Sequence, residues 1–307
     1  MYVFIVNPKA GKGKAKRIFE KIKETDSYQQ INSEYYFTKY PGHGEKIARE
    51  IARKSLPETI IVIGGDGTVH EVINGAGDNK NIRIAVIPGG SGNDFARSCG
   101  IKGNAAEIFE NIIRGENSES YWIGQYTLNK QLKKNFVNSI GFGFDAQIAN
   151  KANHSFYKHI FNFLRLGNVT YIIALIQVLI QFQPMQIELE VDGRPRKLQN
   201  CWMITCGNHP YYGGGMKIIP GAANRSDRIS LIIIHEISKW KVLTLFFTVF
   251  FGKHTSFKEV EVLEGRKIKV SSQHLLHVQV DGETAVCYQS QIEKNPTPLS
   301  VVRQTKK

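Results

Sequence analysis

Through the first 122 residues, short apolar runs alternate with longer segments of mixed polarity. The runs predict strands at 2–6, 34–38, 59–63 and 82–87. The longer segments predict helices at 12–24, 44–54 and 69–75, the second of which places Ile47, Ala48 and Ile51 on one face. Strands and helices in alternation indicate an α/β domain with a doubly wound parallel sheet. Such sheets bind ligands at the carboxyl ends of their strands.

Beyond residue 122 the pattern changes to short strands. They are expected at 135–140, 186–191, 198–206, 228–234, 257–263, 267–271, 276–280 and 284–288, with a helical insert at 155–183. Asp192-Gly193 and Asp281-Gly282 predict hairpin turns, because both dipeptides tolerate positive φ. We therefore expect a C-terminal antiparallel β-sandwich domain over 123–295. A last strand at 298–302 lies in a tail, 296–307, that is expected to return to the first domain, 1–122.

The chain has 307 residues, of which 42% are hydrophobic, and this length and composition fit two globular domains. A net charge of +13 favours partners that carry phosphate: nucleic acid, an anionic lipid surface or a phosphorylated ligand. The sequence has no zinc-finger, homeodomain or aromatic RNA-binding signature, which argues against nucleic acid. The four cysteines show no CxxC spacing, so we expect neither a zinc site nor a disulfide framework, and a reduced, cytoplasmic setting.

Two apolar segments, 171–180 and 242–251, are shorter than the roughly 18–20 residues that a membrane-spanning helix needs. We expect buried helices there, in preference to membrane contact, and either segment offers lining for an acyl-chain pocket. Residues 1–6 lack the basic start and the long apolar core of a signal peptide, and are expected to form a buried strand.

The strongest candidate site follows the third strand. Gly64-Gly65-Asp66-Gly67-Thr68 stands between a buried strand and the start of a helix. Glycines let the backbone come within hydrogen-bond distance of a phosphate, which the N–H groups at a helix start attract. Asp66 beside a phosphate implies a cation or a proton between them, and so points to Mg²⁺ or to proton transfer. A tight turn capped by Asp66 is the simpler alternative, but it requires fewer glycines.

Two further loops repeat this arrangement. Pro88-Gly89-Gly90-Ser91-Gly92-Asn93-Asp94-Phe95 follows the fourth strand, where Ser91 can donate to a phosphate and Asp94 can cap a helix. Asn7-Pro8-Lys9-Ala10-Gly11-Lys12-Gly13-Lys14 follows the first strand, and matches neither a Walker motif nor a full dinucleotide fingerprint. Glycine-rich loops after neighbouring strands predict a cradle for phosphate groups.

These three loops resemble the catalytic domain shared by diacylglycerol kinases, sphingosine kinases and their bacterial relatives. The resemblance continues through 136–146, Asp227 and Val280-Asp281-Gly282-Glu283, and so covers nearly the whole chain in the right order. It implies an N-terminal fold like those of phosphofructokinase and NAD kinase. It also implies transfer of the γ-phosphate of ATP, with Mg²⁺, to a hydroxyl of diacylglycerol or a related lipid.

The resemblance implies roles residue by residue. Asp281 would accept the proton of the lipid hydroxyl, supported by Glu283, and Asp66 is the rival candidate for this base. The residues implied to hold ATP are Asn7, Pro8, Lys9, Ala10, Gly11, Thr38, Gly65, Asp66, Gly67, Thr68, Val69, His70, Glu71, Ser91 and Asp94. A structural Mg²⁺ would be bound in the second domain by Asn224, Asp227 and Ile229, since oxygen ligands suit this hard cation.

The chain departs from the family pattern at two positions. Arg228 replaces the usual glycine beside Asp227, and Trp122 stands where the family commonly has an aspartate that joins a network near Mg²⁺. From spacing alone, Asp281 would be an ordinary residue of an Asp-Gly turn, and only the resemblance gives it a catalytic role. Parts of 156–182, with 211–215, are candidates for a lipid pocket.

NAD kinases share the Gly-Gly-Asp-Gly-Thr loop and are the sharpest alternative enzyme. A nucleotide sensor or anionic-membrane-binding protein without catalysis is the non-enzymatic alternative. We prefer the lipid kinase, because Asp66, Asp94, Asp281 and Glu283 are all present and the later NAD kinase motifs are not. We expect a cytoplasmic protein, peripheral at the inner face of the membrane, that meets its lipid at an anionic surface and binds no nucleic acid. A homodimer is a further hypothesis.

Overall fold

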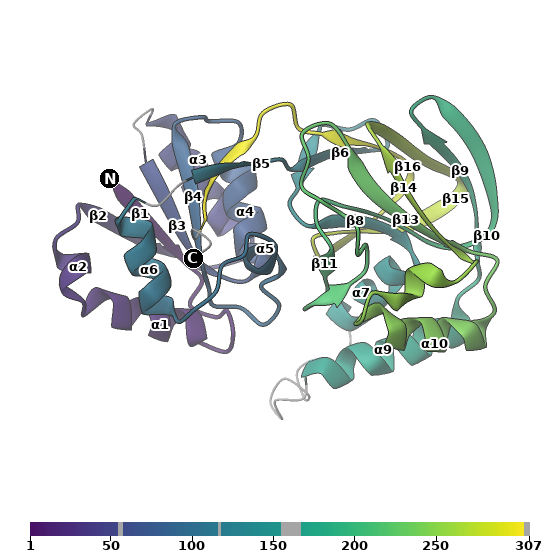
Figure 1. The fold of residues 1–307 in the computed structure, drawn as a ribbon, viewed down its shortest axis with the longest axis horizontal. Helices are drawn as coiled ribbons and strands as arrows, with labels where there is room; N and C mark the ends of the chain where they lie inside the picture. The colour runs from purple at the N-terminus through teal and green to yellow at the C-terminus, as the bar shows by residue number, and fades with distance from the viewer. Residues whose placement is uncertain (55–57, 116–117, 155–166, 304–307) are drawn as a thin grey trace. The chain divides into compact units, whose positions relative to one another are not determined.

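The computed structural model describes residues 1–54, 58–115, 118–154 and 167–303, which form two compact units (Figure 1). The first unit contains Met1–Ile123, Tyr211–Gly215 and Asn295–Lys307, and the second contains Gly124–Pro210 and Met216–Lys294. The sequence places 211–215 in the second domain, but this segment belongs to the first unit. The reason is a long-range hydrogen bond, in which Gly214 N–H donates to Asp94 Oδ2 at 2.8 Å.

The first unit is built on a six-stranded sheet with the order β2-β1-β3-β4-β17-β5. All neighbouring pairs are parallel except β17 with β5. The strands are β1 (Tyr2–Val6), β2 (Ser33–Phe37), β3 (Glu58–Gly64), β4 (Ile82–Pro88), β5 (Ser118–Tyr121) and β17 (Leu299–Val302). β1, β3 and β4 are apolar along most of their length, because helices bury both faces of the sheet. These three neighbours bring the loops at their carboxyl ends side by side.

The helices of this unit pack in pairs, α1 with α6 and α3 with α4. They are α1 (Lys14–Lys23), α2 (Asp26–Gln29), α3 (His43–Arg53), α4 (Asp66–Ala76), α5 (Asp94–Ser98) and α6 (Ala105–Ile113). The face expected for the second helix is confirmed, since Ile47, Ala48 and Ile51 are buried. α3 and α4 approach so closely that a Cβ atom at Gly75 would lie 2.2 Å from Glu45 O.

The second unit is an antiparallel nine-stranded sheet with the order β14-β13-β10-β8-β15-β16-β6-β7, and β9 pairs with both β10 and β15. Its strands are β6 (Gly124–Leu128), β7 (Lys134–Phe136), β8 (Ser139–Gly143), β9 (Met185–Val191), β10 (Arg194–Gly207), β13 (Ile229–His235), β14 (Val260–Gly265), β15 (Lys267–Val280) and β16 (Glu283–Lys294). β11 (Tyr211–Tyr212) and β12 (Met216–Lys217) form a separate pair. β10 and β15 each pair with β9 in their first half and with β8 in their second, with register shifts along the way. These long strands give the unit its sandwich architecture.

Two strand expectations in this unit are wrong. The single strand expected at 135–140 is two strands, β7 and β8, and the two expected at 267–271 and 276–280 are the one strand β15. In the first case the backbone N–H groups of 137–139 bond to a side chain instead of a neighbouring strand. In the second, an irregular stretch between Ser271 and Leu276 interrupts the pairing without ending the strand.

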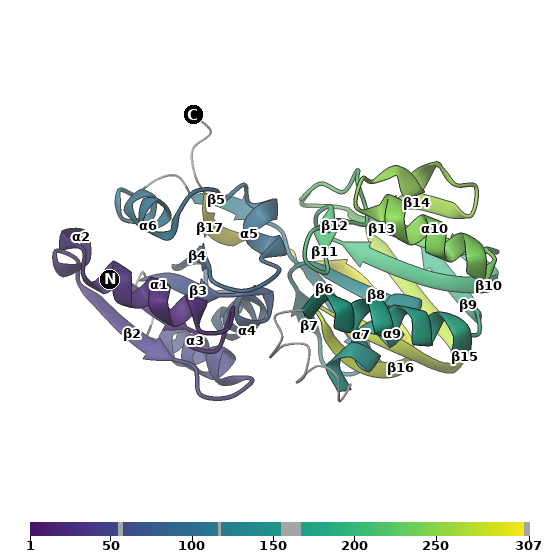
Figure 2. The ribbon, with the colours of Figure 1, turned by 90° about the horizontal axis from the view of Figure 1, so that it is seen from below.

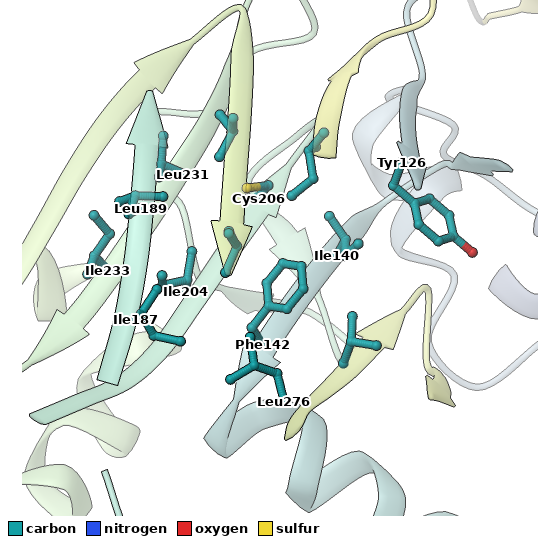
Figure 3. Close-up of a cluster of buried hydrophobic side chains, with 14 of the residues drawn as sticks. Tyr126, Ile140, Phe142, Ile187, Leu189, Ile204, Cys206, Leu231, Ile233 and Leu276 are labelled. Atoms are coloured by element: carbon teal, nitrogen blue, oxygen red, sulfur yellow. The ribbon is translucent and has the colours of Figure 1, made fainter. Parts of the chain in front are cut away.

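The core of the second unit is a cluster of buried hydrophobic side chains, most of them aliphatic (Figure 3). Alternate positions of each strand point inward, so that Ile187 and Leu189 of β9 lie beside Ile204 of β10 and Leu231 of β13. Each such side chain stabilises the fold by about 1.5–3 kcal/mol through burial alone.

Helices α7 (Phe144–His154), α9 (Gly167–Gln181) and α10 (Lys239–Val249) and the 3₁₀ turn η1 (Lys253–Ser256) complete the second unit. Residues 155–166 of the expected helical insert lie outside the described residues. Among the helices that are described, none has the length and apolar character needed to cross a bilayer.

The expectation that the apolar segments 171–180 and 242–251 are buried helices is wrong for part of their surface. Val242, Leu245 and Val249 are buried, but Phe247 is 68% and Phe251 76% exposed. Both faces of α10 are apolar and only one packs against the unit, so the average hydropathy of the segment could not distinguish them.

Candidate active site

Three glycine-rich loops leave β1, β3 and β4 at the same edge of the first sheet: the first loop (7–13), the second loop (64–68) and the third loop (88–93). Gly89 N–H donates to Gly64 O at 2.8 Å. A Cβ atom at Gly90 would lie 2.3 Å from Gly65 Cα, and one at Gly11 would lie 2.3 Å from Gly89 O. Many of the glycines are therefore required by the close approach of one loop to the next.

Asn7 ties the first loop to the second. Its Nδ2 donates to Thr68 Oγ1 at 3.0 Å, and its Oδ1 accepts the N–H of Lys9 at 3.1 Å. Thr68 is buried, and a Cβ atom at Gly64 would lie 2.6 Å from its Oγ1. Both side chains hold the loops in shape, and their predicted contact with ATP stays a prediction. Of the other residues predicted in this loop, Lys9 is exposed and Pro8 and Ala10 are half-buried.

Asn93 closes the third loop on itself. From a left-handed conformation (φ 56°), its Oδ1 accepts Gly90 N–H and its Nδ2 donates to Gly90 O, both at 2.9 Å. This turn leaves Ser91 exposed at the tip of the loop. Asp66 Oδ1 accepts the N–H of Phe95 at 2.9 Å, so the acid of the second loop also caps the start of α5.

Asp94 is almost fully buried and bonds in two directions. One carboxylate oxygen accepts from Arg97, and the other accepts from Gly214 N–H at 2.8 Å. The guanidinium of Arg97 in turn lies 5.7 Å from the ring centre of Tyr211. Asp94 thereby attaches 211–215 to the first unit, a role that the sequence did not indicate.

Glu71 supports the start of α3. Its two carboxylate oxygens accept Gly42 N–H at 2.8 Å and Gly44 N–H at 2.9 Å, which satisfies N–H groups that a helix start leaves unpaired. His70 lies beside Asn74, with 3.3 Å between His70 Nε2 and Asn74 Nδ2. The side chains of Val69 and Thr38 are buried.

Gly67 is different, because its side-chain direction is open. It lies in the first turn of α4, and a Cβ atom placed there would have no atom within 4 Å apart from its chain neighbours and the backbone of its own helix. The N–H groups of the first turn of a helix lack intrahelical partners and carry the positive end of its dipole. Gly67 and the exposed Ser91 thus mark a surface of the loops suited to a phosphate group.

A cavity of about 870 Å³ opens on another side of the third loop, between α1, α5 and α6. Four cationic side chains line it, from Lys14, Lys21, Arg97 and Lys102. None of the residues predicted to hold ATP lines this cavity. Its size would accept a nucleotide, so it is a rival position that a binding experiment has to separate from the loops.

In the second unit, Asp281 and Gly282 form the predicted hairpin turn between β15 and β16, with φ values of 50° and 93°. The Asp281 carboxylate accepts the N–H groups of Val137 at 2.7 Å, Asn138 at 2.7 Å and Ser139 at 3.0 Å. It therefore fixes the segment between β7 and β8. Glu283 is exposed at the first position of β16.

A buried polar network that the sequence analysis missed surrounds this segment. Lys294 Nζ donates to Asn208 Oδ1 at 2.7 Å, and Asn208 Nδ2 donates to Phe136 O and Val137 O. Burial lowers the pKa of Lys294 to about 7, against a smaller raising effect of Asp227. The signal that could have revealed it is the alternation of inward- and outward-facing residues along a strand. Lys294 stands two positions after the buried Ile292 of β16 and therefore faces inward as well.

The proposed Mg²⁺ ligands of the second unit lie among arginines. Arg228 Nε and Arg266 Nη2 are 3.5 and 3.6 Å from Asp227 Oδ2, so two guanidinium groups already supply the counter-charge of this carboxylate. Binding of a divalent cation by Asn224, Asp227 and Ile229 stays a prediction. Nowhere in the described ranges do three His, Cys, Asp or Glu side chains gather to hold a metal ion.

Comparison with known proteins agrees with this architecture. Residues 1–123 match the family described as diacylglycerol kinase catalytic domain, and residues 138–303 match the YegS C-terminal NAD kinase beta sandwich-like domain. A diacylglycerol kinase structure from Bacillus anthracis superposes with a TM-score of 0.72 at 21% identity, covering 99% of this chain and 96% of that one, which supports the fold.

Relatives similar over most of their length carry kinase names. A Bacillus subtilis (strain 168) protein named "Putative lipid kinase YtlR" is 29% identical over 306 residues, 98% of each chain. A Mycobacterium tuberculosis (strain H37Rv) protein named diacylglycerol kinase is 27% identical over 246 residues, 80% of this chain and 77% of its own. Because both its catalytic domain and its β-sandwich domain match, and three glycine-rich loops suited to phosphate lie in the first of them, the chain belongs to the diacylglycerol kinase-like family of lipid kinases.

Proposed function

We propose that this enzyme transfers the γ-phosphate of ATP to a hydroxyl group of diacylglycerol or a related membrane lipid. The observation that carries the proposal is the set of three mutually fitted glycine loops after the adjacent strands β1, β3 and β4. Phosphoryl transfer needs phosphate positioning and charge compensation more than covalent chemistry, and such loops supply the positioning.

We place the phosphates of ATP, as part of this proposal, at the open surface beside Gly67. A side chain there would occupy space that the fold itself leaves empty, which is a reason for glycine that packing does not provide. Backbone N–H groups of α4 and the Ser91 hydroxyl would donate to the phosphate oxygens. Mg²⁺ brought with ATP would offset the charge of these oxygens.

Asp281 is the proposed proton acceptor, with Glu283 in support. Three backbone N–H groups hold its carboxylate in a fixed position, and a carboxylate can take a proton from a hydroxyl. A weakly basic aspartate in this role is known chemistry for phosphoryl transfer to alcohols. Asp66 remains the rival base, although one of its oxygens also caps α5.

The test is transfer of label from [γ-³²P]ATP to a panel of lipid hydroxyls in mixed micelles with Mg²⁺, for the native enzyme and for Asp281→Asn and Asp66→Asn. If Asp281 is the base, Asp281→Asn lowers kcat by about 10²- to 10⁴-fold while the affinity for ATP is retained. If Asp281 only holds 137–139, the same change lowers the thermal stability and leaves most of kcat. A loss confined to Asp66→Asn would assign the base to Asp66.

The same experiment separates the alternatives. Label on NAD in place of lipid would indicate a dinucleotide kinase, a reaction compatible with the shared β-sandwich domain. Binding of ATP without transfer to any acceptor would indicate a nucleotide sensor on this fold.

A further inference from the structure

Helix α10 carries a second apolar face that the unit does not cover. Its inward face consists of Val242, Leu245 and Val249. The exposed aromatic residues recur at helical spacing along the opposite side and just past the helix end: Trp240 (83% exposed), Phe247 (68%), Phe250 (50%) and Phe251 (76%). A helix that packs on one side normally turns polar residues outward. Four exposed aromatic rings on one segment therefore indicate a surface that binds a partner.

Lysines predominate among the charged residues around these rings, in a segment bounded by Glu236 and Glu259. Residues 237–258 contain four lysines, Lys239, Lys241, Lys253 and Lys258, and no aspartate or glutamate. Lys241 pairs with Glu259, just outside the segment, with 2.6 Å between Nζ and Oε1. Aromatic rings flanked by lysines, without acids among them, fit an interface that is apolar below and anionic above.

Helix α9 extends the same surface. Lys239 Nζ donates to Ile180 O at 2.6 Å, which joins the end of α9 to the start of α10. Ile176 and Ile180 are 48% and 68% exposed, and 167–181 contains no charged residue. In Figures 1 and 2 both helices run along the same side of the strands of the second unit. We call Ile176, Ile180, Trp240, Phe247, Phe250 and Phe251 the aromatic surface.

We propose that the aromatic surface docks the enzyme on an anionic phospholipid bilayer, with its rings at the level of the acyl-chain boundary and the neighbouring lysines on headgroup phosphates. This inference rests on the proposed function, because a lipid kinase has to reach an acceptor that stays in the membrane. A bilayer suits the surface better than a protein partner, since lysines are depleted from the centres of protein interfaces while aromatic rings with lysines are typical of interfacial helices.

The test measures binding to vesicles of phosphatidylcholine with and without phosphatidylglycerol, in the absence of nucleotide. Two readouts are used: co-sedimentation, and the emission of Trp240, which is exposed, whereas Trp202 is buried and Trp122 is half-buried. We expect a blue shift on anionic vesicles that disappears in Trp240→Phe. The double variant Phe247→Glu/Phe251→Glu should lose at least about a hundredfold in vesicle affinity, because each ring removed from the bilayer is worth at least about tenfold.

The control is Leu132→Glu, which places a charge at an exposed apolar residue of the second unit outside the aromatic surface, 89% exposed between β6 and β7. It should bind vesicles like the native enzyme. Equal affinity of the native enzyme and the double variant would overturn the proposal. So would a native dimer that the double variant converts to a monomer without any vesicle binding by either, since the surface would then join two copies.

Activity towards short-chain diacylglycerol in solution keeps this proposal separate from the proposed function. If both hold, the double variant phosphorylates the dispersed lipid normally and loses activity only on vesicles. Vesicle binding without phosphorylation of any lipid would leave the docking surface standing and reject the kinase assignment.

Discussion

At the scale of single residues, Gly67 allows two requirements for a glycine to be distinguished, namely the packing of the fold and the binding of a ligand. Gly67→Ala should stabilise the fold by about 0.5–1 kcal/mol, because a Cβ meets no neighbour there and alanine favours the helix. The same methyl group should weaken ATP binding by at least about tenfold, since it would occupy the proposed phosphate seat. Thermal unfolding and ATP titration check the two halves of the prediction.

Two variants serve as controls for Gly67→Ala. Gly90→Ala should destabilise the protein, because its Cβ would lie 2.3 Å from Gly65 Cα. Lys21→Ala changes the cavity between α1, α5 and α6 and should leave the ATP affinity unchanged. A loss of ATP binding in Lys21→Ala, with normal binding in Gly67→Ala, would move the nucleotide into that cavity.

Lys294 should make the stability of the protein depend on pH. Burial lowers its pKa from 10.5 to about 7, so between these values the unfolded chain binds more protons than the folded one, and the free energy of unfolding rises with pH. Below about pH 7 both states carry the proton and this contribution has no slope. From pH 7 to 8.5 the native protein should gain about 1–2 kcal/mol relative to Lys294→Met, at about 1.4 kcal/mol per pH unit.

Urea unfolding of both proteins across this range checks the prediction. The comparison with Lys294→Met is needed because unfolded cysteines, with a pKa near 8.5, also titrate towards the end of this range. Burial raises the pKa of Cys99 and of Cys287 to about 11, so these thiols lower the stability at higher pH in both proteins alike. Parallel curves for the two proteins would show that Lys294 keeps its proton in the fold.

At the scale of elements, local pattern was sufficient where neighbours in sequence decide the structure. α3 spans His43–Arg53 where 44–54 was expected, because the spacing of Ile47, Ala48 and Ile51 defines a buried face without distant help. The break between β7 and β8 was not predictable in this way. It depends on the Asp281 carboxylate, 144 positions from Val137, which takes N–H groups that would otherwise continue the strand.

Strand β17 gives an element-scale prediction. It lies between β4 and β5, with Val301 fully buried and Ser300 partly exposed. Val301→Ala should destabilise the protein by about 1–3 kcal/mol, because it leaves a cavity in the sheet that carries the third loop. Ser300→Ala on the other face should change it by less than about 0.5 kcal/mol. Thermal unfolding distinguishes them, and equal melting temperatures would mean that β17 contributes little to the first unit.

At the scale of the whole molecule, the candidate site shows why motifs are easier to predict than roles. The three loops could be located because strand, glycines and helix follow one another in sequence. The contacts of the individual side chains could not be predicted, because they join segments that are far apart in the sequence. Glu71 supports α3 from 27 to 29 positions away, and Asp94 binds Gly214 from 120 positions away.

The net charge of +13, from 40 basic and 27 acidic residues, gives the last prediction. Membrane docking should have two separable parts. Attraction of the whole basic molecule to anionic lipid is screened beyond about 10 Å at 0.1 M salt, whereas insertion of the aromatic surface is not. Raising the salt should therefore weaken binding of the native enzyme to phosphatidylglycerol vesicles but preserve its advantage over Phe247→Glu/Phe251→Glu.

Neutralising two of the lysines near the rings isolates the charge part. Lys253→Gln/Lys258→Gln should lower affinity for anionic vesicles at low salt by about ten- to thirtyfold, at about 1 kcal/mol per lysine, and should leave binding to neutral vesicles unchanged. Vesicle titrations at low and at physiological salt measure both parts. The opposite outcome is that high salt abolishes the difference in affinity between the native enzyme and Phe247→Glu/Phe251→Glu. The variant would then bind less tightly only because its glutamates repel anionic lipid, and insertion of the rings would be excluded.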